Sequence, residues 1–483
     1  MEATLRTPAA LARGVFSREI NLNHHNSEKE VSRRQKRMTA TTQDIQVQSP
    51  SVTQQQQKNI PCSTRELVRE AILPYLGTRL ALVLIGLLAD FYILPLIKTN
   101  PILPSAQANM HFPNLFWLMW LRFDAGFYVD IAMHGYWSAS TLHTYSNWAF
   151  YPLFPMLIYP LGHLFGGSLD AFELAGLLIS NVAALVAVSY LYLLVHREFG
   201  MQIASRTLIL LALFPTSFYL SAIYSESVFL ACSVACIYYA REHRWWLAGL
   251  CGGLATLARA QGILLLVPVL WEYWQVLSDR YAPLPDGNSG ASTREQARHW
   301  LSSRLRGPLL AARGLRNWLS LFALALIPAG LLAFMLYAKI QTGDFLATFH
   351  NQKWGWGRHF EFPWQTLSDT LTHPLAANPM EWNFWLLNLL AAAIFLGFTV
   401  WAFRKLPLTY AFYTLVMVLL PISTSRLNSV SRYYLVVFPA LILLALWSSD
   451  EKHPRRKDFL LPLFASLQAV FMIFFVLGLP AIA

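Results

Sequence analysis

Long apolar runs separated by short polar connections dominate the sequence beyond about residue 78. A helix that crosses a bilayer needs about 20 predominantly apolar residues. About eleven runs approach that length: Thr78–Ile97, Ala171–Val195, Thr207–Ala222, Val228–Ala240, Trp245–Ala258, Gly262–Val276, Trp318–Ala338, Trp382–Phe403, Leu406–Ile422, Tyr433–Trp447 and Phe459–Pro480. The pattern predicts an all-α, polytopic integral membrane protein with about 11 transmembrane helices.

Two further segments have helical character but do not read as straight spans. Ser63–Pro74 is typical of a short amphipathic helix that lies on the membrane surface before the first span. Trp148–Phe165 is apolar but contains Pro152, Pro155 and Pro160. Because proline interrupts a straight helix, we expect a re-entrant or interfacial element there.

The first 61 residues differ in composition from the rest. They are polar, with a basic cluster from Arg33 to Arg37 and a glutamine run from Gln54 to Gln57. Such a segment buries too little apolar surface to fold, so we expect residues 1–61 to form a disordered cytoplasmic basic tail. Residues 62–483 are then expected to form a single transmembrane domain.

Composition and charge agree with a membrane protein. The chain of 483 residues is 55% hydrophobic and only 13% charged, which excludes a soluble enzyme. Its net charge of +11 could suggest nucleic acid, but the basic residues follow short connections, as the positive-inside rule describes. This places the basic loop 278–317 in the cytoplasm and loops 98–170 and 339–381 on the other side. The four cysteines show no metal-ligand spacing.

The non-cytoplasmic side collects the unusual ionisable residues. Asp124, Asp130, Glu226, Arg259 and Arg432 all fall there, and charged groups placed in or against a bilayer usually line a functional cavity. The segment 120–136 has helical periodicity and is predicted to lie flat on the outer interface. It would hold a carboxylate at the mouth of such a cavity.

Each of these residues also has a structural interpretation. Asp124 could pair with Arg122 at the headgroup level, Glu226 could cap the next helix, and Arg432 could reach the membrane interface from the start of its span. Arg259 interrupts an apolar stretch, where Gly262 would allow a break, and needs an anion, either Glu226 or a phosphate.

A second outer segment carries weaker signals. Lys353 and Arg358 flank Trp354-Gly-Trp-Gly and could meet an anionic head group or a sugar. No Walker motif, dinucleotide fingerprint, Gly-x-Ser-x-Gly or His-Glu-x-x-His pattern occurs. A carboxylate with buried arginines beside a lipid-accessible cavity fits transfer from a lipid-phosphate donor.

Three runs in order carry a family resemblance. Arg122-Phe-Asp-Ala-Gly-Phe-Tyr128, Ile131-Ala-Met-His-Gly-Tyr136 and Ala149-Phe-Tyr-Pro-Leu-Phe-Pro155 resemble the signature of the PIG-V-like mannosyltransferase family, which is related to GPI mannosyltransferase 2. Later blocks are similar to those of the family as well: Tyr224–Glu226, Arg259–Gly262, and Arg432-Tyr433 followed by Phe438-Pro439. The resemblance covers about residues 75–448.

The resemblance implies a GT-C-type membrane glycosyltransferase. It would move mannose from a polyprenyl- or dolichyl-phosphate-linked donor to an acceptor hydroxyl on the non-cytoplasmic face, with inversion, and Asp124 takes the catalytic position. The family usually has Trp before this Asp, where this chain has Phe123. The candidate substrate- or donor-binding residues are Arg122, Tyr128, His134, Tyr151, Glu226, Arg259, Arg432 and Tyr433. We expect no metal and no cofactor, because only Asp124, Asp130 and Glu226 offer hard-cation ligands.

Two other functional classes compete with an enzyme. A transporter or flippase of a lipid-linked or anionic substrate would use the same arginines, but no repeat at a half-chain period is visible. A nonenzymatic scaffold would not need the convergent charges. For an enzyme, the acceptor is open among lipid, polymer and protein, and nucleic acid is not expected. The absence of Asn-x-Ser/Thr in the outer loops favours a bacterial plasma membrane, with the endoplasmic reticulum membrane as the alternative.

Overall fold

The computed structural model describes residues 63–93, 116, 119–282, 302–304, 306–307, 310, 314–372 and 379–479. The predicted tail 1–61, residues 98–115 of the first outer loop and most of the predicted cytoplasmic loop 278–317 lie outside the described residues. Within the described ranges the regular structure is helical, apart from one isolated β-bridge between Phe360 and Thr424. The prediction of an all-α chain is therefore confirmed.

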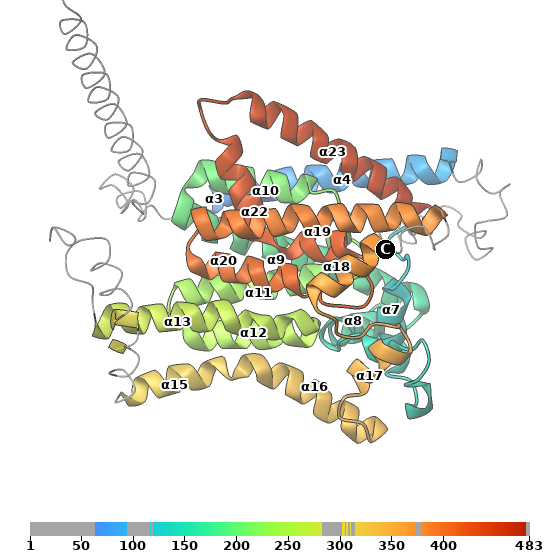
Figure 1. Ribbon diagram of the computed structural model, residues 1–483. Coiled ribbons are helices and arrows are strands. Elements are labelled where there is room, and N and C mark those ends of the chain that lie inside the picture. Colours follow the sequence, from blue (N-terminus) through green and yellow to red (C-terminus); the bar gives the residue numbers. More distant parts are fainter. Residues whose placement is uncertain are drawn as a thin grey trace, which may run out of the picture. The chain divides into compact units, whose positions relative to one another are not determined.

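Most of the described chain consists of apolar helices packed side by side (Figure 1). In chain order the α-helices are α3 (Thr64–Leu67), α4 (Leu73–Leu88), α7 (Ala125–His134), α8 (Leu153–Leu164), α9 (Leu169–Phe199), α10 (Met201–Leu213), α11 (Glu226–Arg241), α12 (Trp245–Ala258), α13 (Leu266–Tyr281), α15 (Leu315–Leu324), α16 (Leu326–Thr342), α17 (Ala347–Trp354), α18 (Pro363–Thr372), α19 (Pro379–Lys405), α20 (Leu408–Leu419), α21 (Val430–Tyr433), α22 (Phe438–Ser448) and α23 (Arg455–Val476).

Each of the predicted apolar runs overlaps at least one of these helices. Among the described residues, six helical stretches are long and apolar enough to cross a membrane: Thr64–Ile93, Leu169–Phe199, Ala260–Tyr281, Asn317–Thr342, Leu386–Lys405 and Arg455–Val476. A seventh candidate is the pair Val430–Val436 and Phe438–Ser448, which is bent by 75°. The helices α8, α10, α12 and α20 are apolar but shorter. The chain is a multi-pass membrane protein, and the count of about 11 spans stays a prediction.

Two predicted boundaries are wrong. Ser63–Pro74 is not a separate surface helix, because Thr64–Ile93 is one continuous helical stretch. A π-helical segment, Val68–Ile72, precedes Pro74 and leads into α4, so the missing N–H of Pro74 does not end the helix. The run predicted over Thr207–Ala222 is α-helical only to Leu213, with Pro215 just beyond the helix end.

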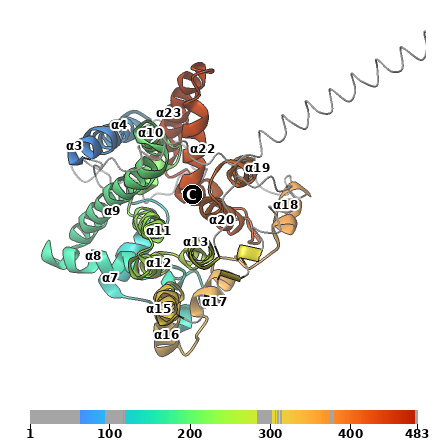
Figure 2. The same cartoon turned by 90° about the vertical axis from the view of Figure 1, so that its left-hand side faces the viewer.

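The proline-rich segment forms the short helix α8, which contains Pro160 and packs against α7 and α9. Its 12 residues span about 18 Å, less than the thickness of a hydrocarbon core. Figure 2 views α11, α12 and α13 nearly end-on, and α8 extends sideways from them. These observations agree with the predicted interfacial element.

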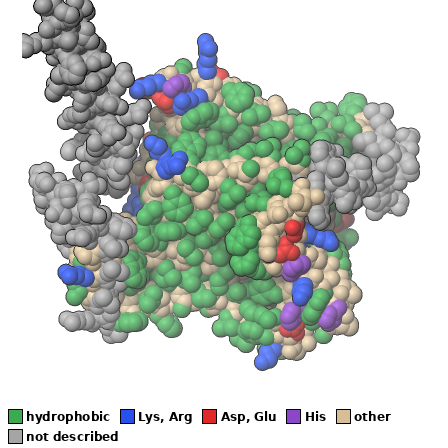
Figure 3. Space-filling model, in the orientation of Figure 1, with side chains coloured by type: hydrophobic (Ala, Val, Ile, Leu, Met, Phe, Trp, Pro, Cys, Tyr) green, Lys and Arg blue, Asp and Glu red, His purple; other side chains and the backbone are tan. Residues whose placement is uncertain are grey.

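The long helices have two chemically different ends. Short connections join neighbouring helices in antiparallel pairs, α9 with α10, α11 with α12 and α19 with α20. Basic residues lie at these connections: Arg197, Arg241, Arg404 and Lys405 in the last turns of α9, α11 and α19, and Arg244 between α11 and α12. The helices α7, α8, α17 and α18 gather at the opposite end, on the right of Figure 1. Hydrophobic side chains cover the surface between the two ends in Figure 3, as expected for a bilayer-facing belt.

Candidate functional site

Four ionisable side chains from distant parts of the sequence meet at the end formed by α7, α8, α17 and α18. Arg432 Nη1 lies 3.0 Å from Asp124 Oδ2, and Arg432 Nε lies 3.2 Å from Glu226 Oε1. Arg259 Nη1 lies 2.6 Å from the same oxygen of Glu226. Glu226 is buried at 1% side-chain exposure, whereas Asp124 remains 19% exposed. We call Asp124, Glu226, Arg259 and Arg432 the charge cluster.

Asp124 is held at the N-terminal boundary of α7 by an unusual backbone conformation. The preceding residue, Phe123, has φ +53°, which is costly for a bulky side chain. The buried hydroxyl of Tyr224 fixes this conformation, because it donates to Arg122 O at 2.7 Å and accepts from Asp124 N–H at 3.1 Å. The side chain of Asp124 makes no capping bond to α7, so its carboxylate is directed to Arg432 instead.

Glu226 occupies the first turn of α11, where the helix dipole favours a negative charge. The predicted capping role is wrong, because the N-cap residue is Ser225 and the carboxylate of Glu226 faces the two arginines. Ser225 links a further predicted residue to the cluster. Its Oγ lies 2.9 Å from Tyr128 OH and accepts a bond from Arg259 Nη1 at 3.3 Å.

Arg259 sits at a break between α12 and a 3-10 segment, Ala260–Leu265, as the sequence predicts from Gly262. The backbone of Arg259 is extended, with φ −157° and ψ 147°. Gly262 packs so closely on the end of α12 that a Cβ atom there would lie 2.2 Å from Thr256 N. The absence of a side chain at Gly262 therefore permits the turn that places Arg259 beside Glu226.

Aromatic rings surround the guanidinium groups. The Tyr433 ring has the guanidinium carbons of Arg259, Arg358 and Arg432 at 5.1, 6.0 and 5.3 Å from its centroid. Its hydroxyl accepts a bond from Arg358 Nη1 at 2.8 Å. Cation–π attraction of this kind strengthens as water is excluded, so Tyr433 holds three arginines together without neutralising them.

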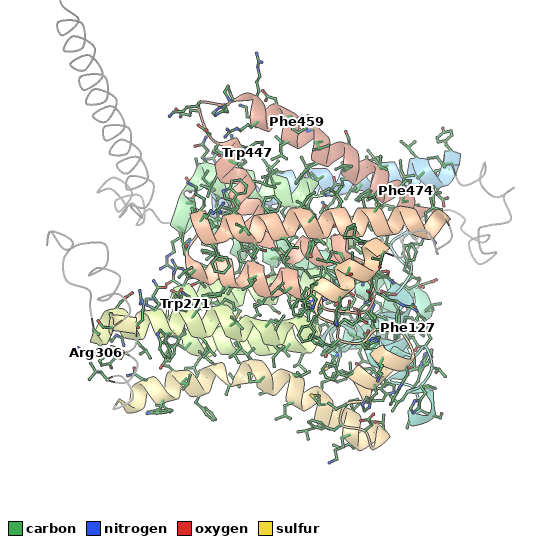
Figure 4. The ribbon with its side chains drawn as sticks, in the orientation of Figure 1. Phe127, Trp271, Arg306, Trp447, Phe459 and Phe474 are labelled. Carbon is green, nitrogen blue, oxygen red and sulfur yellow. The ribbon has the colours of Figure 1, made fainter. Side chains whose placement is uncertain are left out.

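Parts of the two predicted outer loops, 98–170 and 339–381, contact each other. The buried amide of Asn351 on α17 donates at 2.9 Å to Leu142 O, Thr144 O and Ser146 Oγ. Beside it, the rings of Tyr145 and Trp356 lie 3.9 Å apart between centroids. Figure 4 shows Phe127, a neighbour of both rings, at this same end of the helices.

Tyr145 lies close enough to the charge cluster to respond to it. Partial burial, followed by the negative charge of Asp124, raises the pKa of Tyr145 to about 12. Its phenol is therefore protonated at neutral pH and is available as a hydrogen-bond donor. Tyr145 as a whole is 52% exposed, which leaves it accessible to a substrate.

Tyr128, through Ser225, and Tyr433 adjoin the charge cluster, but three other predicted site residues have their contacts elsewhere. Arg122 does not pair with Asp124, and its Nε donates to Val476 O at 2.9 Å because the turn at Phe123 separates the two side chains. His134 pairs with Asp130, with Nδ1 at 3.0 Å from Oδ1, and is 65% exposed. Tyr151 is buried against Phe334, with ring centroids 5.1 Å apart.

Three residues join the site that are not among the predicted site residues. The ring centroids of Tyr219 and Tyr224 lie 5.5 and 5.2 Å from the guanidinium carbon of Arg432. Ser225 bridges Tyr128 and Arg259. Tyr224 and Ser225 immediately precede Glu226 in one of the family-like blocks. Their position next to Glu226 could have identified them as site residues from the sequence. Tyr219 has no such signal.

The formal charges in this region do not cancel. Arg259 and Arg432 contact the carboxylates of Asp124 and Glu226, and Arg358 joins them through Tyr433, so three positive charges lie near two negative ones. Within the described residues, no group of three His, Cys, Asp or Glu side chains is arranged to hold a metal ion. The unbalanced charge suits an anionic ligand, and guanidinium groups bind phosphate oxygens well.

Comparison with known proteins adds a partial family match. Residues 152–282 match the family described as dolichyl-phosphate-mannose-protein mannosyltransferase. This range is about a quarter of the chain and includes Glu226 and Arg259, while Asp124 and Arg432 lie outside it. No curated protein matches the chain.

Two solved structures are similar to the chain at low identity. ArnT from Cupriavidus metallidurans, bound to undecaprenyl phosphate, is 14% identical with a TM-score of 0.40, and the match covers 75% of each chain. The archaeal oligosaccharyltransferase AglB from Archaeoglobus fulgidus, in complex with an inhibitory peptide and a dolichol-phosphate, is 14% identical with a TM-score of 0.37. That match covers 84% of this chain but only 56% of AglB. At these values neither structure indicates which substrate this chain uses.

Proposed function

We propose that the protein is a GT-C-type membrane glycosyltransferase that moves mannose from a polyprenyl- or dolichyl-phosphate donor to an acceptor hydroxyl. The observation that carries the proposal is the convergence of a partly exposed carboxylate, Asp124, with three arginines and one buried carboxylate. The family match over residues 152–282 supports a lipid-phosphate-linked mannose donor.

Each side chain has a distinct role in this proposal. Asp124 takes the proton from the acceptor hydroxyl while the acceptor oxygen bonds to the anomeric carbon of the sugar. The bond between that carbon and the phosphate oxygen breaks, and its electron pair leaves with the lipid phosphate. Arg259, Arg358 and Arg432 stabilise the charge of the departing phosphate. Attack opposite the leaving group inverts the anomeric configuration.

The contacts of Arg432 fit this division of labour. Arg432 contacts both Asp124 and Glu226, so it holds the base in place while it contributes charge to the phosphate side. Glu226 keeps Arg259 and Arg432 close together and lies too deeply to reach solvent. The two carboxylates balance two of the three arginines, so one positive charge remains to bind the phosphate of the donor.

The experiment compares membranes that contain the wild-type protein or its Asp124→Asn variant. Radiolabelled mannose is supplied as polyprenyl-phosphate-mannose, and label is counted in lipid, polymer and protein fractions. We expect transfer to fall at least about a thousandfold in the variant, because an amide cannot accept the proton. Asp369→Asn on α18, an exposed carboxylate on the same side, should transfer normally.

The same experiment can reject the proposal. Equal transfer by Asp124→Asn and wild type, at equal amounts of folded protein, would remove the base from the mechanism. If membranes with the wild-type protein incorporated no more label than membranes without the protein, a different donor or a transporter would be favoured.

A further inference from the structure

A cluster of aromatic rings begins one helical turn beyond Asp124. The ring centroid of Phe127 on α7 lies 5.3 Å from that of Tyr145, 5.8 Å from that of Trp356 and 4.8 Å from that of Phe150. Tyr145 is the most exposed of these four residues. We call them the aromatic cluster, and Figure 4 labels its central member, Phe127.

The backbone around Tyr145 is fixed by the second outer segment. Gly355 packs so closely on the residue before Tyr145 that a Cβ atom at Gly355 would lie 2.1 Å from Thr144 O. The amide of Asn351 donates to the same carbonyl at 2.9 Å. The ring of Tyr145 lies against that of Trp356, with centroids 3.9 Å apart. The position of this ring is therefore set by the protein before a ligand binds, which lowers the entropic cost of a contact.

The hydroxyl of Tyr145 is available to a ligand. Among the described residues it makes no hydrogen bond to the protein. Exposed tyrosines are common at a membrane interface, where they act as anchors. Tyr145 differs from such an anchor, because its ring is packed in the aromatic cluster and its phenol lies close to charges of the site.

Tyr145 lies between the two halves of the proposed reaction. Partial burial and the charge of Asp124 raise the pKa of its phenol, whereas the charge of Arg358 lowers it. The rings on either side of Tyr145 come from the same two places. Phe127 follows Asp124 on α7, and Trp356 precedes Arg358 by two residues. The phenol is therefore near both the base and one of the arginines that are expected to bind phosphate.

One part of the substrates must occupy the space between the base and the phosphate. The anomeric carbon of the transferred sugar is bonded first to the phosphate and then to the acceptor oxygen. The sugar must therefore lie between the arginines and Asp124. An aromatic ring with a free hydroxyl suits such a ligand, because C–H groups of a sugar pack on the negative face of the ring and its hydroxyls accept hydrogen bonds.

We propose that Tyr145 contacts the transferred sugar and donates a hydrogen bond to one of its hydroxyls, so that it helps to select the sugar. This inference rests on the proposed glycosyl transfer and adds a specificity-determining residue to it. Tyr145 is outside the charge cluster and takes no part in the proton transfer or in binding the phosphate.

The test pairs one protein hydroxyl with each sugar hydroxyl in turn. Tyr145→Phe removes the phenolic oxygen and keeps the ring. The donors are polyprenyl-phosphate-mannose and four analogues in which the mannose hydroxyl at carbon 2, 3, 4 or 6 is replaced by hydrogen. Initial rates of transfer give kcat/KM for wild type and variant with each donor. The intrinsic reactivity of a donor cancels, because the two proteins are compared on the same donor.

We expect Tyr145→Phe to lower kcat/KM about five- to tenfold with the complete mannose donor. The loss should disappear with the one analogue that lacks the hydroxyl bonded to Tyr145, and it should persist with the other three. The matched control is Tyr92→Phe, at a tyrosine that is 70% exposed and outside the aromatic cluster. It should stay within about twofold of wild type with every donor. Size-exclusion chromatography in detergent measures the amount of folded protein.

Two results would overturn the inference while leaving the proposed function intact. An equal loss with all five donors would mean that the hydroxyl serves the fold or the acceptor instead of the transferred sugar. No loss with any donor would mean that the hydroxyl contacts neither substrate. Labelling by wild-type protein that is absent, or that does not depend on Asp124, would instead reject the proposed function.

Discussion

At the scale of single residues, the site is organised by charges that are individually unfavourable in a membrane. Glu226 is almost completely buried, yet it faces both Arg259 and Arg432 within 3.2 Å. Burying one charge without a partner costs several kcal/mol, so each member is tolerated because the others are present. This mutual dependence predicts that the arginines both stabilise the fold, by pairing with Glu226, and bind the ligand.

Replacing Arg259 should weaken the use of the donor. In Arg259→Ala, a charged contact to the lipid phosphate is lost, and we expect the donor KM to rise about 10- to 100-fold. The measurement is the initial rate of mannose transfer against donor concentration. Arg206→Ala is the control. Arg206 donates to Ser448 O at the end of α22 and to Ser449 Oγ just beyond it, and it does not contact the charge cluster. An unchanged donor KM in Arg259→Ala would make this arginine purely structural.

The charge cluster can be predicted from the sequence because its members are ionisable residues that the basic connections place on one side of the membrane. Asp124, Glu226, Arg259 and Arg432 are singled out in this way, and the structure brings all four together. The alternative interpretation, in which Asp124 pairs with Arg122, is wrong because proximity in the chain does not determine side-chain direction. The positive φ of Phe123 turns the chain there, and a single sequence contains no signal for that conformation.

At the scale of elements, the break after α12 determines where Arg259 lies. The break depends on Gly262, because a Cβ atom at this position would lie only 2.2 to 2.4 Å from backbone atoms of Ala255 and Thr256. Glycine is required here for close approach of two backbones rather than for an unusual φ.

Substitution of Gly262 should therefore damage the site. Gly262→Ala is expected to destabilise the protein by about 1–3 kcal/mol and to lower transfer, because the 3-10 segment must move away from α12. Gly397→Ala, in the middle of α19 with open space around it, should be neutral or slightly stabilising. Thermal unfolding in nanodiscs and the rate of transfer measure the two effects. Equal unfolding temperatures for both variants would contradict this account of the break.

Helix positions are predictable because apolar composition over a window of residues is a strong signal. Local backbone geometry cannot be predicted in this way. The π-helical turn at Val68–Ile72 joins what the sequence divides into a surface helix and a span. The bend of 75° before Phe438 divides what the sequence describes as one span. Both features depend on contacts between elements, which hydrophobic periodicity does not contain.

At the scale of the whole helical domain, a second buried ionic network lies on the side of the basic connections. Arg241 Nε lies 2.6 Å from Glu198 Oε1, and Arg241 Nη1 lies 2.8 Å from Glu272 Oε1. Thr409 Oγ1 donates to Glu272 as well. These side chains belong to α11, α9, α13 and α20, so one network joins four helices away from the charge cluster.

This separation predicts that stability and catalysis respond to different substitutions. Glu272→Ala leaves Arg241 with one carboxylate in a buried position, and we expect a loss of about 3–5 kcal/mol of stability. Glu242→Ala removes a partner of Arg197 that is 33% exposed, and should cost at most about 1 kcal/mol. Both variants should keep the wild-type donor KM at a temperature where they are folded, because neither residue contacts the charge cluster. If Glu272→Ala raised the donor KM in fully folded protein, the two ends would be energetically coupled through α13, and the arginines could no longer be treated as an independent site.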